Sequence, residues 1–270
     1  MDQRYTLSNF ISALKEPSKL LYEPEYLLSK LLFELKHGTG IDVMERDWDN
    51  LLILDACRTD FFAEHNDIDG EFRTAVSRGT TSSEFIDANF AGRELHDTIY
   101  VTANPFVERL SDDVFFKVYY AELFEEWDHS LKTIPPEALV EATVEMHERY
   151  PNKRLITHFM QPHVPYIGPF GQELSERYEF GVFNPDLKDA DDFDIPTVSI
   201  PQAVEEGAIT EAELRRAYDE NVRIAIEHAG ALIDRLDGKS VITADHGEML
   251  GDRVIVTKRY EHANAHTPEL

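Results

Sequence analysis

The sequence predicts an α/β protein built on a mostly parallel sheet that helices cover on both faces. Four apolar runs of strand length recur along the 270 residues, and helical stretches lie between them. The runs are continuously apolar and do not alternate with polar residues, as expected for strands buried on both faces. Strands that alternate with helices favour parallel pairing, because each helical crossover returns the chain to the same end of the sheet.

The predicted elements follow one another in a regular order. The strand-like runs are 51–56, 98–105, 153–162 and 240–247. Helices are predicted over 136–149 and 211–236, and the second has apolar residues at three- and four-residue spacing, which makes it amphipathic. We expect a helical preface over 1–45, one α/β domain over 46–270, and a long loop or insertion over 170–205.

Composition narrows the class of protein. There are 52 acidic against 26 basic residues, a net charge of −26, which excludes nucleic acid and anionic membranes as partners. Such a surface suits a soluble protein in the cytoplasm of a salt-rich, halophilic cell. Cys57 is the single cysteine, so no intramolecular disulfide can form. No apolar run reaches the roughly 20 residues that a membrane span needs.

Acidic and imidazole side chains stand where three of the strand-like runs end. Asp55 ends the first run, His158 and then His163 belong to the third, and Asp245 and His246 end the fourth. Since the carboxyl ends of parallel strands meet at one edge of the sheet, these groups are expected to converge. Carboxylates with an imidazole form a suitable shell for a divalent metal ion.

A cluster of hydroxyls follows the first strand in "SRGTTSSEF", residues 77–85, just before a probable helix. A metal-bound hydroxyl loses its proton more easily, which would turn Thr80 into a nucleophile near neutral pH. The same cluster is also typical of an ordinary helix start, in which Thr81 is the N-cap and Glu84 completes a capping box.

The other candidates have structural interpretations too. Asp55 would serve equally well as the cap of a helix that begins near Arg58. His163 lies between two prolines and is, taken alone, an ordinary loop histidine. Cys57 is interpreted as a small buried side chain whose pKa the neighbouring Asp55 raises, which disfavours a thiolate nucleophile.

Several segments together resemble the sulfatases and their relatives in the alkaline phosphatase superfamily. The similar segments, in family order, are "NLLILDACRTD", "THFMQPHVPY", "AYDENVRIAIEHAGALIDRL", "VITADHGEMLG" and "TKRYEHANAHTPEL". They run from residue 50 to the end of the sequence, and the most specific is the Asp-His-Gly-Glu strand end at 245–248. The resemblance implies a three-layer α/β/α sandwich that acts on phosphate or sulfate esters.

The resemblance also implies roles for individual residues. Asp55, Asp245 and His246 would bind a divalent metal ion (Mn²⁺, Mg²⁺ or Ca²⁺) together with the hydroxyl of Thr80. The residues that would hold the anionic group of the substrate are His163, Lys258 and His262.

The nucleophile is the main departure from the family. The Cys-x-Pro-Ser-Arg motif of classical sulfatases is absent. "RGTTSSEF" instead resembles the Gly-Thr-x-x-x-Glu-Phe stretch of the lipoteichoic-acid-synthase-like branch, which favours Thr80. Alignment to archaeal sulfatase-like proteins favours Ser82, and Thr81 lies between them. The sequence also stops at Leu270, where family members continue into further sheet, so we expect a trimmed or truncated domain.

Three functions are compatible with these observations. The leading hypothesis is a metal-dependent hydrolase or transferase that acts on a phosphate or sulfate ester through a Thr or Ser nucleophile. The alternative is a non-catalytic protein of the same fold that binds an anionic glycan or a protein partner. A nucleotide-binding domain is disfavoured, because no strand is followed by a glycine-rich phosphate loop.

Overall fold

A computed structural model describes residues 35, 38–178, 203–204 and 206–251. Its centre is a five-stranded, all-parallel sheet in the order β3-β2-β4-β1-β5. The strands are β1 (Asn50–Asp55), β2 (Leu95–Thr102), β3 (Phe115–Tyr119), β4 (Arg154–Pro162) and β5 (Ser240–Ala244). The predicted parallel α/β architecture is therefore confirmed.

Four of these strands coincide with the predicted apolar runs, and β3 was not predicted. β3 has only five residues and forms one edge of the sheet. Its sequence, "FFKVY", is rich in aromatic and β-branched residues, a strand signal that its short length and central lysine obscure.

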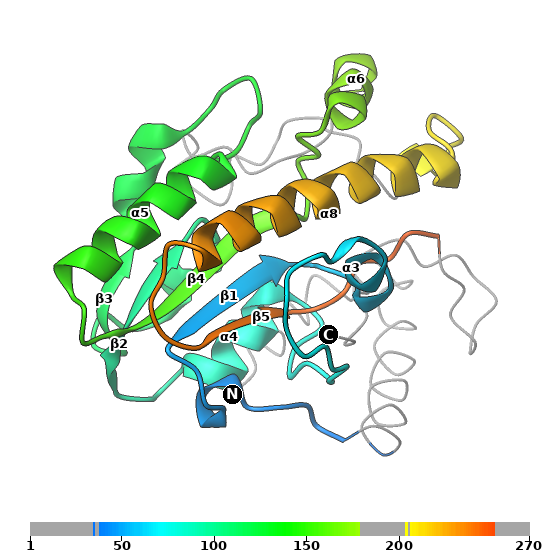
Figure 1. Cartoon of the computed structure of the whole chain (residues 1–270). Helices are drawn as coiled ribbons and strands as arrows, with labels where there is room; N and C mark the ends of the chain where they lie inside the picture. The colour runs from blue at the N-terminus through cyan, green and yellow to red at the C-terminus, as the bar shows by residue number, and fades with distance from the viewer. Residues whose placement is uncertain (1–34, 36–37, 179–202, 205, 252–270) are drawn as a thin grey trace, which may run out of the picture.

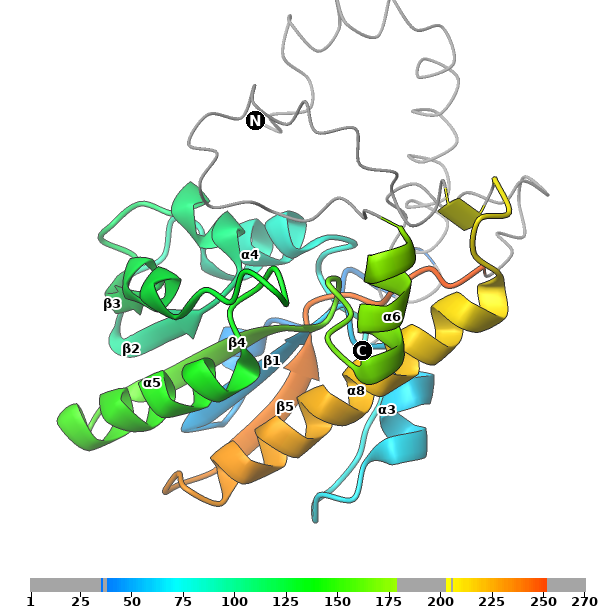
Figure 2. The same ribbon diagram turned by 90° about the horizontal axis from the view of Figure 1, so that it is seen from above.

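Helices lie on both faces of the sheet, which gives the three layers (Figure 1). α5 and α8 run side by side over one face, and α4 lies against the other (Figures 1 and 2). The α-helices are α3 (Thr59–His65), α4 (Ser82–Phe90), α5 (Pro136–Arg149), α6 (Pro169–Arg177) and α8 (Glu211–Ile233). Short 3-10 helices are η2 (Val43–Glu45), η3 (Pro105–Arg109) and η4 (Ala121–Glu126).

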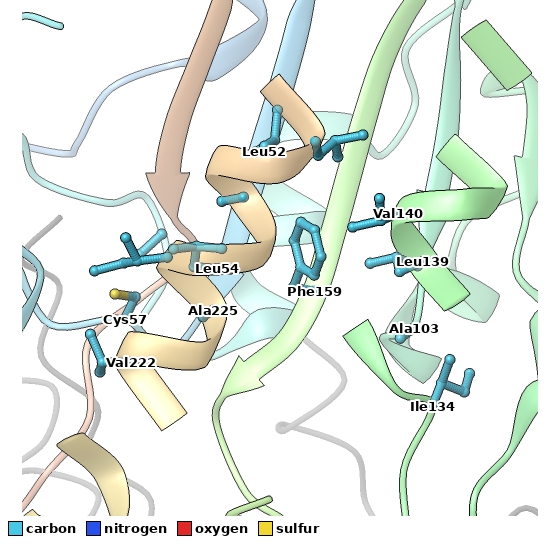
Figure 3. Close-up of a cluster of buried hydrophobic side chains, with 14 of the residues drawn as sticks. Leu52, Leu54, Cys57, Ala103, Ile134, Leu139, Val140, Phe159, Val222 and Ala225 are labelled. Carbon is cyan, nitrogen blue, oxygen red and sulfur yellow. The ribbon is translucent and has the colours of Figure 1, made fainter. Parts of the chain in front are cut away.

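β1 explains why the strands are continuously apolar. Leu52 and Leu54 belong to the core under α5 and α8, which Figure 3 shows, whereas Leu51 and Ile53 belong to the core under α4. All four side chains are fully buried. Because successive side chains of a strand point to opposite faces, a strand between two helical layers must be apolar at every position.

The helices begin where local chemistry favours a start. Thr210 and Glu213 form a complete capping box at α8, in which each side chain hydrogen-bonds to the other residue's backbone N–H. α5 matches the predicted 136–149 and begins with Pro136, whose missing N–H costs nothing in the first turn.

The prediction of a loop over 170–205 is wrong for its first part, where α6 forms. Pro169 stands in the first turn of α6, and Phe170 and Leu174 bury their side chains in the core. Proline and glycine suggested a loop, but proline at this position starts a helix. Residues 179–202 and most of the predicted preface over 1–45 lie outside the described residues.

The described end of the predicted preface packs on the sheet domain. Val43 belongs to the core under α4. Asp42 is buried and forms ion pairs with Arg78 and Arg93. Within the part of the chain that the structure describes, no helix combines the length and apolar character that crossing a membrane requires.

Candidate metal centre

Three buried side chains converge near the carboxyl ends of adjacent strands. Asp55 is the last residue of β1, His158 belongs to β4, and Asp245 directly follows β5. β1 lies between β4 and β5, and Ile53 of β1 pairs in register with His158. Parallel pairing therefore brings residues 55, 158 and 245, which lie far apart in the chain, to one point, as expected for an α/β sheet.

The distances between these groups define a compact cluster. The Nε2 atom of His158 lies 3.8 Å from Oδ2 of Asp55 and 3.7 Å from Oδ2 of Asp245. One donor atom from each of the three residues lies within 4.8 Å of the others. All three side chains are essentially inaccessible to solvent.

His246 and Ser82 adjoin this cluster. The Nε2 atom of His246 lies 3.6 Å from Oδ1 of Asp55 and 3.3 Å from Oδ2 of Asp245. The hydroxyl of Ser82, the first residue of α4, lies 3.2 Å from that same Nε2 and 3.2 Å from Oδ2 of Asp55. Two carboxylates, two imidazoles and one hydroxyl thus share a single buried region.

The tautomer of His246 follows from its neighbours. Its Nδ1 lies 2.8 Å from the carbonyl oxygen of Gly247, and a carbonyl can only accept a hydrogen bond. Nδ1 therefore carries the proton in the neutral imidazole. The lone pair of Nε2 then faces Ser82 and the two carboxylates.

Further polar contacts fix the carboxylates. Asn104, which follows β2, donates to Oδ2 of Asp55 over 2.6 Å. The backbone N–H groups of Ala56 and His246 both donate to Oδ1 of Asp245 over 2.9 Å. Ala56 adopts a left-handed backbone with φ of 58°, which costs a residue with a side chain about 1–2 kcal/mol. Such strain is typical of functional sites.

The cluster is electrostatically suited to a cation. Burial by itself would raise the pKa of Asp245, but the interactions with His246, with His158 and with the N–H of Ala56 outweigh burial and hold this pKa well below its usual value. Asp245 is therefore a buried anion. Buried carboxylates are stable only when they are paired with a positive charge or bind a metal ion.

Unsatisfied polar atoms provide a direct test of whether a metal ion fits. Among the described residues, Nε2 of His158 and Oδ2 of Asp245 have no hydrogen-bond partner although both are buried. Metal–ligand distances of about 2.0–2.2 Å place neighbouring ligand atoms roughly 3–4 Å apart. The observed separations agree with this spacing, so the residues fit a divalent ion.

The three candidate hydroxyls occupy different positions. Thr81 caps α4 by accepting from the N–H of Glu84, as the capping interpretation predicts. Glu84 was predicted to complete a capping box with Thr81, but its carboxylate instead accepts from the N–H and hydroxyl of Thr80, one residue before the cap. Of the three, Ser82 is the residue with hydrogen bonds to Asp55 and His246.

The predicted substrate-binding residues are only partly described. His163 lies beside the cluster, where its N–H donates to the carbonyl of Asp55 over 3.0 Å and its ring lies 3.9 Å from Glu248. Lys258 and His262 lie outside the described residues.

Two structural interpretations can be judged directly. Asp55 does not cap the helix near Arg58, because Arg58 itself is the cap of α3 and no side chain caps it. Cys57 is buried, as predicted, and its thiol pKa is raised well above the usual value. The causes are burial first, then the charges of Asp245 and Asp60, and not the predicted Asp55.

Sequence reasoning missed three residues of the site. His158 was noted at a strand end but given no role, Asn104 follows β2 in the predicted run, and Tyr100 lies within β2. A buried polar residue in an apolar strand was the available signal for His158. Nothing local marks Tyr100, because tyrosine is common in strands.

A cavity lies elsewhere on the molecule. It has a volume of about 790 Å³ and extends along the outer edge of β5, where Phe62, Ile68 and Phe72 line it with residues of β5. None of the clustered side chains described above lines this cavity.

Comparisons with known proteins identified no relative, so the site is interpreted from its own geometry. No protein-family model matches the chain, and no curated protein matches it significantly. The fold and the site define an α/β protein with a buried Asp-His-Asp cluster that could hold a metal ion.

Proposed function

We propose that this protein is a metal-dependent hydrolase or transferase that acts on a phosphate or sulfate ester through Ser82. The observation that carries the proposal is the position of the Ser82 hydroxyl, 3.2 Å from both His246 and Asp55 beside the Asp55–His158–Asp245 cluster. The motif resemblance to the sulfatase-like proteins supports the same class of reaction. A hydroxyl nucleophile favours phosphoryl over sulfuryl transfer.

Each residue has a role in this proposal. Asp55, His158 and Asp245 hold the divalent ion, which when bound supplies positive charge to neutralise the ester oxygens. His246, with its Nε2 lone pair toward Ser82, accepts the hydroxyl proton as general base. His163 lies next to the cluster and contributes to binding of the anionic group.

The reaction proceeds by two substitutions. The Ser82 oxygen forms a bond to phosphorus, the bond from phosphorus to the leaving oxygen breaks, and the proton taken by His246 passes to that leaving oxygen. In the second step His246 takes a proton from water or an alcohol, whose oxygen forms a bond to phosphorus. The bond from phosphorus to Ser82 breaks, and the Ser82 oxygen receives that proton from His246. The first step leaves a serine phosphoester that denaturation should preserve.

The test combines turnover with metal binding. Chelated protein is titrated calorimetrically with Mn²⁺, Mg²⁺, Ca²⁺ and Zn²⁺. Nitrophenyl phosphomonoester, phosphodiester and sulfate ester substrates are then screened at high salt. Ser82→Ala should reduce kcat by about 10³-fold or more, as expected for loss of a nucleophile. Ser83→Ala is the matched control, since its hydroxyl contacts Thr81 and not the cluster.

The outcomes separate the competing hypotheses. If Ser82→Ala kept full activity and Thr80→Ala or Thr81→Ala lost it, the nucleophile would be that threonine and not Ser82. Saturable metal binding without turnover of any ester class would favour the non-catalytic alternative. Asp245→Asn should abolish metal binding, and unchanged affinity in this variant would refute the metal centre.

A further inference from the structure

Tyr100 lies directly behind the candidate metal centre. Its phenol oxygen is 2.7 Å from Nδ1 of His158, the ring nitrogen that faces away from the carboxylates. The two rings are nearly parallel, with 10° between their planes and 6.1 Å between their centroids. Both side chains are fully buried.

The sheet and the aromatic core hold Tyr100 in place. β2 and β4 are neighbouring strands, and Tyr100 pairs in register with Ile156, two residues before His158. Its ring also packs edge-on against Phe90 of α4, with 5.5 Å between centroids, and against Phe115 of β3, with 5.1 Å. The phenol oxygen is therefore presented to His158 by rigid elements on three sides.

The proton on His158 decides whether this residue can bind a metal ion. A neutral imidazole has one N–H and one lone pair, and only the lone pair can ligate. Ligation through Nε2 requires the proton to be on Nδ1, where Tyr100 is the acceptor.

We infer that Tyr100 is a positioning residue that holds His158 in the Nδ1–H tautomer and thereby directs its Nε2 lone pair to the metal ion. The inference deepens the proposed function and rests on it, since it assumes that the cluster binds an ion. It also predicts metal preference. A site with an oriented imidazole favours Mn²⁺, Co²⁺ or Zn²⁺ over Mg²⁺ and Ca²⁺, which prefer oxygen ligands.

A purely structural role for Tyr100 makes a different prediction. The ring fills the core between Phe90 and Phe115, and Tyr100→Phe keeps this packing while removing the oxygen. If only packing mattered, this variant would bind metal ions as the wild type does. Removal of a hydrogen-bond partner of a ligating histidine typically weakens metal affinity by about 10–100-fold.

The experiment is a double-mutant cycle on chelated protein, with Co²⁺ and Mg²⁺ affinities measured by calorimetry. Tyr100→Phe should weaken Co²⁺ binding by about 10–100-fold and Mg²⁺ binding less, and should change the visible spectrum of bound Co²⁺. In the His158→Gln background, Tyr100→Phe should change Co²⁺ affinity by no more than about twofold, the usual error of additivity.

A matched control removes a buried hydroxyl elsewhere. Thr143 is buried in α5 and contacts the carbonyl of Leu139 and the hydroxyl of Thr157, over 2.8 and 3.1 Å. Thr143→Val should lose stability but keep Co²⁺ affinity. Equal loss of affinity in this control and in Tyr100→Phe would show general loosening and would overturn the inference.

Two further results would overturn it. One is wild-type Co²⁺ affinity in Tyr100→Phe, and the other is an undiminished effect of Tyr100→Phe in the His158→Gln background. If Tyr100→Phe fails to fold, the inference is tested on the wild-type protein instead, by nitrogen NMR of its histidine side chains in the presence of Zn²⁺. A proton on Nδ1 of His158 supports the inference and one on Nε2 refutes it. Failure of the wild type to bind any ion would instead refute the proposed function.

Discussion

Asn221 of α8 provides the sharpest test of how the loop beside the candidate metal centre is held. Its side chain is fully buried and contacts five backbone groups of one loop. The carbonyl oxygen accepts from two N–H groups, and the amide nitrogen donates to three carbonyls. The N–H groups belong to Ile167 and Gly168, and the carbonyls to Pro162, His163 and Pro165. We predict that Asn221→Ala strongly destabilises the protein.

The magnitude follows from the two shortest of these contacts, 2.8 Å to the N–H of Ile167 and 3.0 Å to the carbonyl of Pro165. Each buried group left without a partner costs about 1–3 kcal/mol, so the expected loss is roughly 2–6 kcal/mol. That is a large part of a typical total stability of about 5–15 kcal/mol. The melting temperature should fall by about 4–24 °C at roughly 2–4 °C per kcal/mol.

The assay is urea unfolding followed by the fluorescence of Trp48 and Trp127, which reports the midpoint and the slope. Asn89→Ala is the matched control, because Asn89 is equally buried in a helix, and its side chain makes only two hydrogen bonds. Both substitutions gain similar helix propensity, so the difference isolates the loop contacts. A loss in Asn221→Ala no larger than that in Asn89→Ala, at unchanged slope, would refute the reasoning.

Two further predictions concern Asp42, which precedes β1, and Gly79, which precedes α4. Burial opposes ionisation of Asp42, yet the hydrogen bond and charge of Arg93 and the other contacts outweigh it and lower its pKa below 3.8. The lowered pKa means that this stabilisation is complete above about pH 4 and is lost as pH falls below it. Acid titrations of the wild type and Asp42→Asn should therefore show a stability gap that closes in this range, and a gap independent of pH would contradict the ion pairs. Gly79→Ala places a methyl group 2.4 Å from the backbone nitrogen of Phe85, so we expect a loss of about 1–3 kcal/mol in thermal unfolding. Gly70→Ala meets no atom within 4 Å and should be nearly neutral, so equal losses in the two variants would disprove the close approach.

Strand sequence was informative because burial on both faces of a parallel sheet leaves a clear pattern. β1 contains the unbroken apolar run 51–54, β4 is largely buried although it includes Thr157 and His158, and both strands were predicted. β3 was not, because it is a short edge strand with an exposed Phe116 and a central Lys117.

Hydroxyl chemistry was the least predictable part of the site. Thr80, Thr81 and Ser82 are adjacent in sequence, and each is compatible with a helix start. Which hydroxyl meets His246 depends on where the first turn of α4 lies relative to the sheet. That placement is set by packing of Phe85 and Phe90 in the core under α4, which no local pattern encodes.

By itself, the sequence determined the parallel α/β architecture and the strand ends that carry Asp55, Asp245 and His246, because hydrophobic periodicity and strand polarity are local properties. Only the tertiary structure decided the strand order, the approach of His158 and Tyr100 from neighbouring strands, and the contact of the Ser82 hydroxyl with His246. These features depend on pairing between residues far apart in the chain. Register and helix placement are fixed by the packing of the whole domain, so they emerge only when the layers assemble.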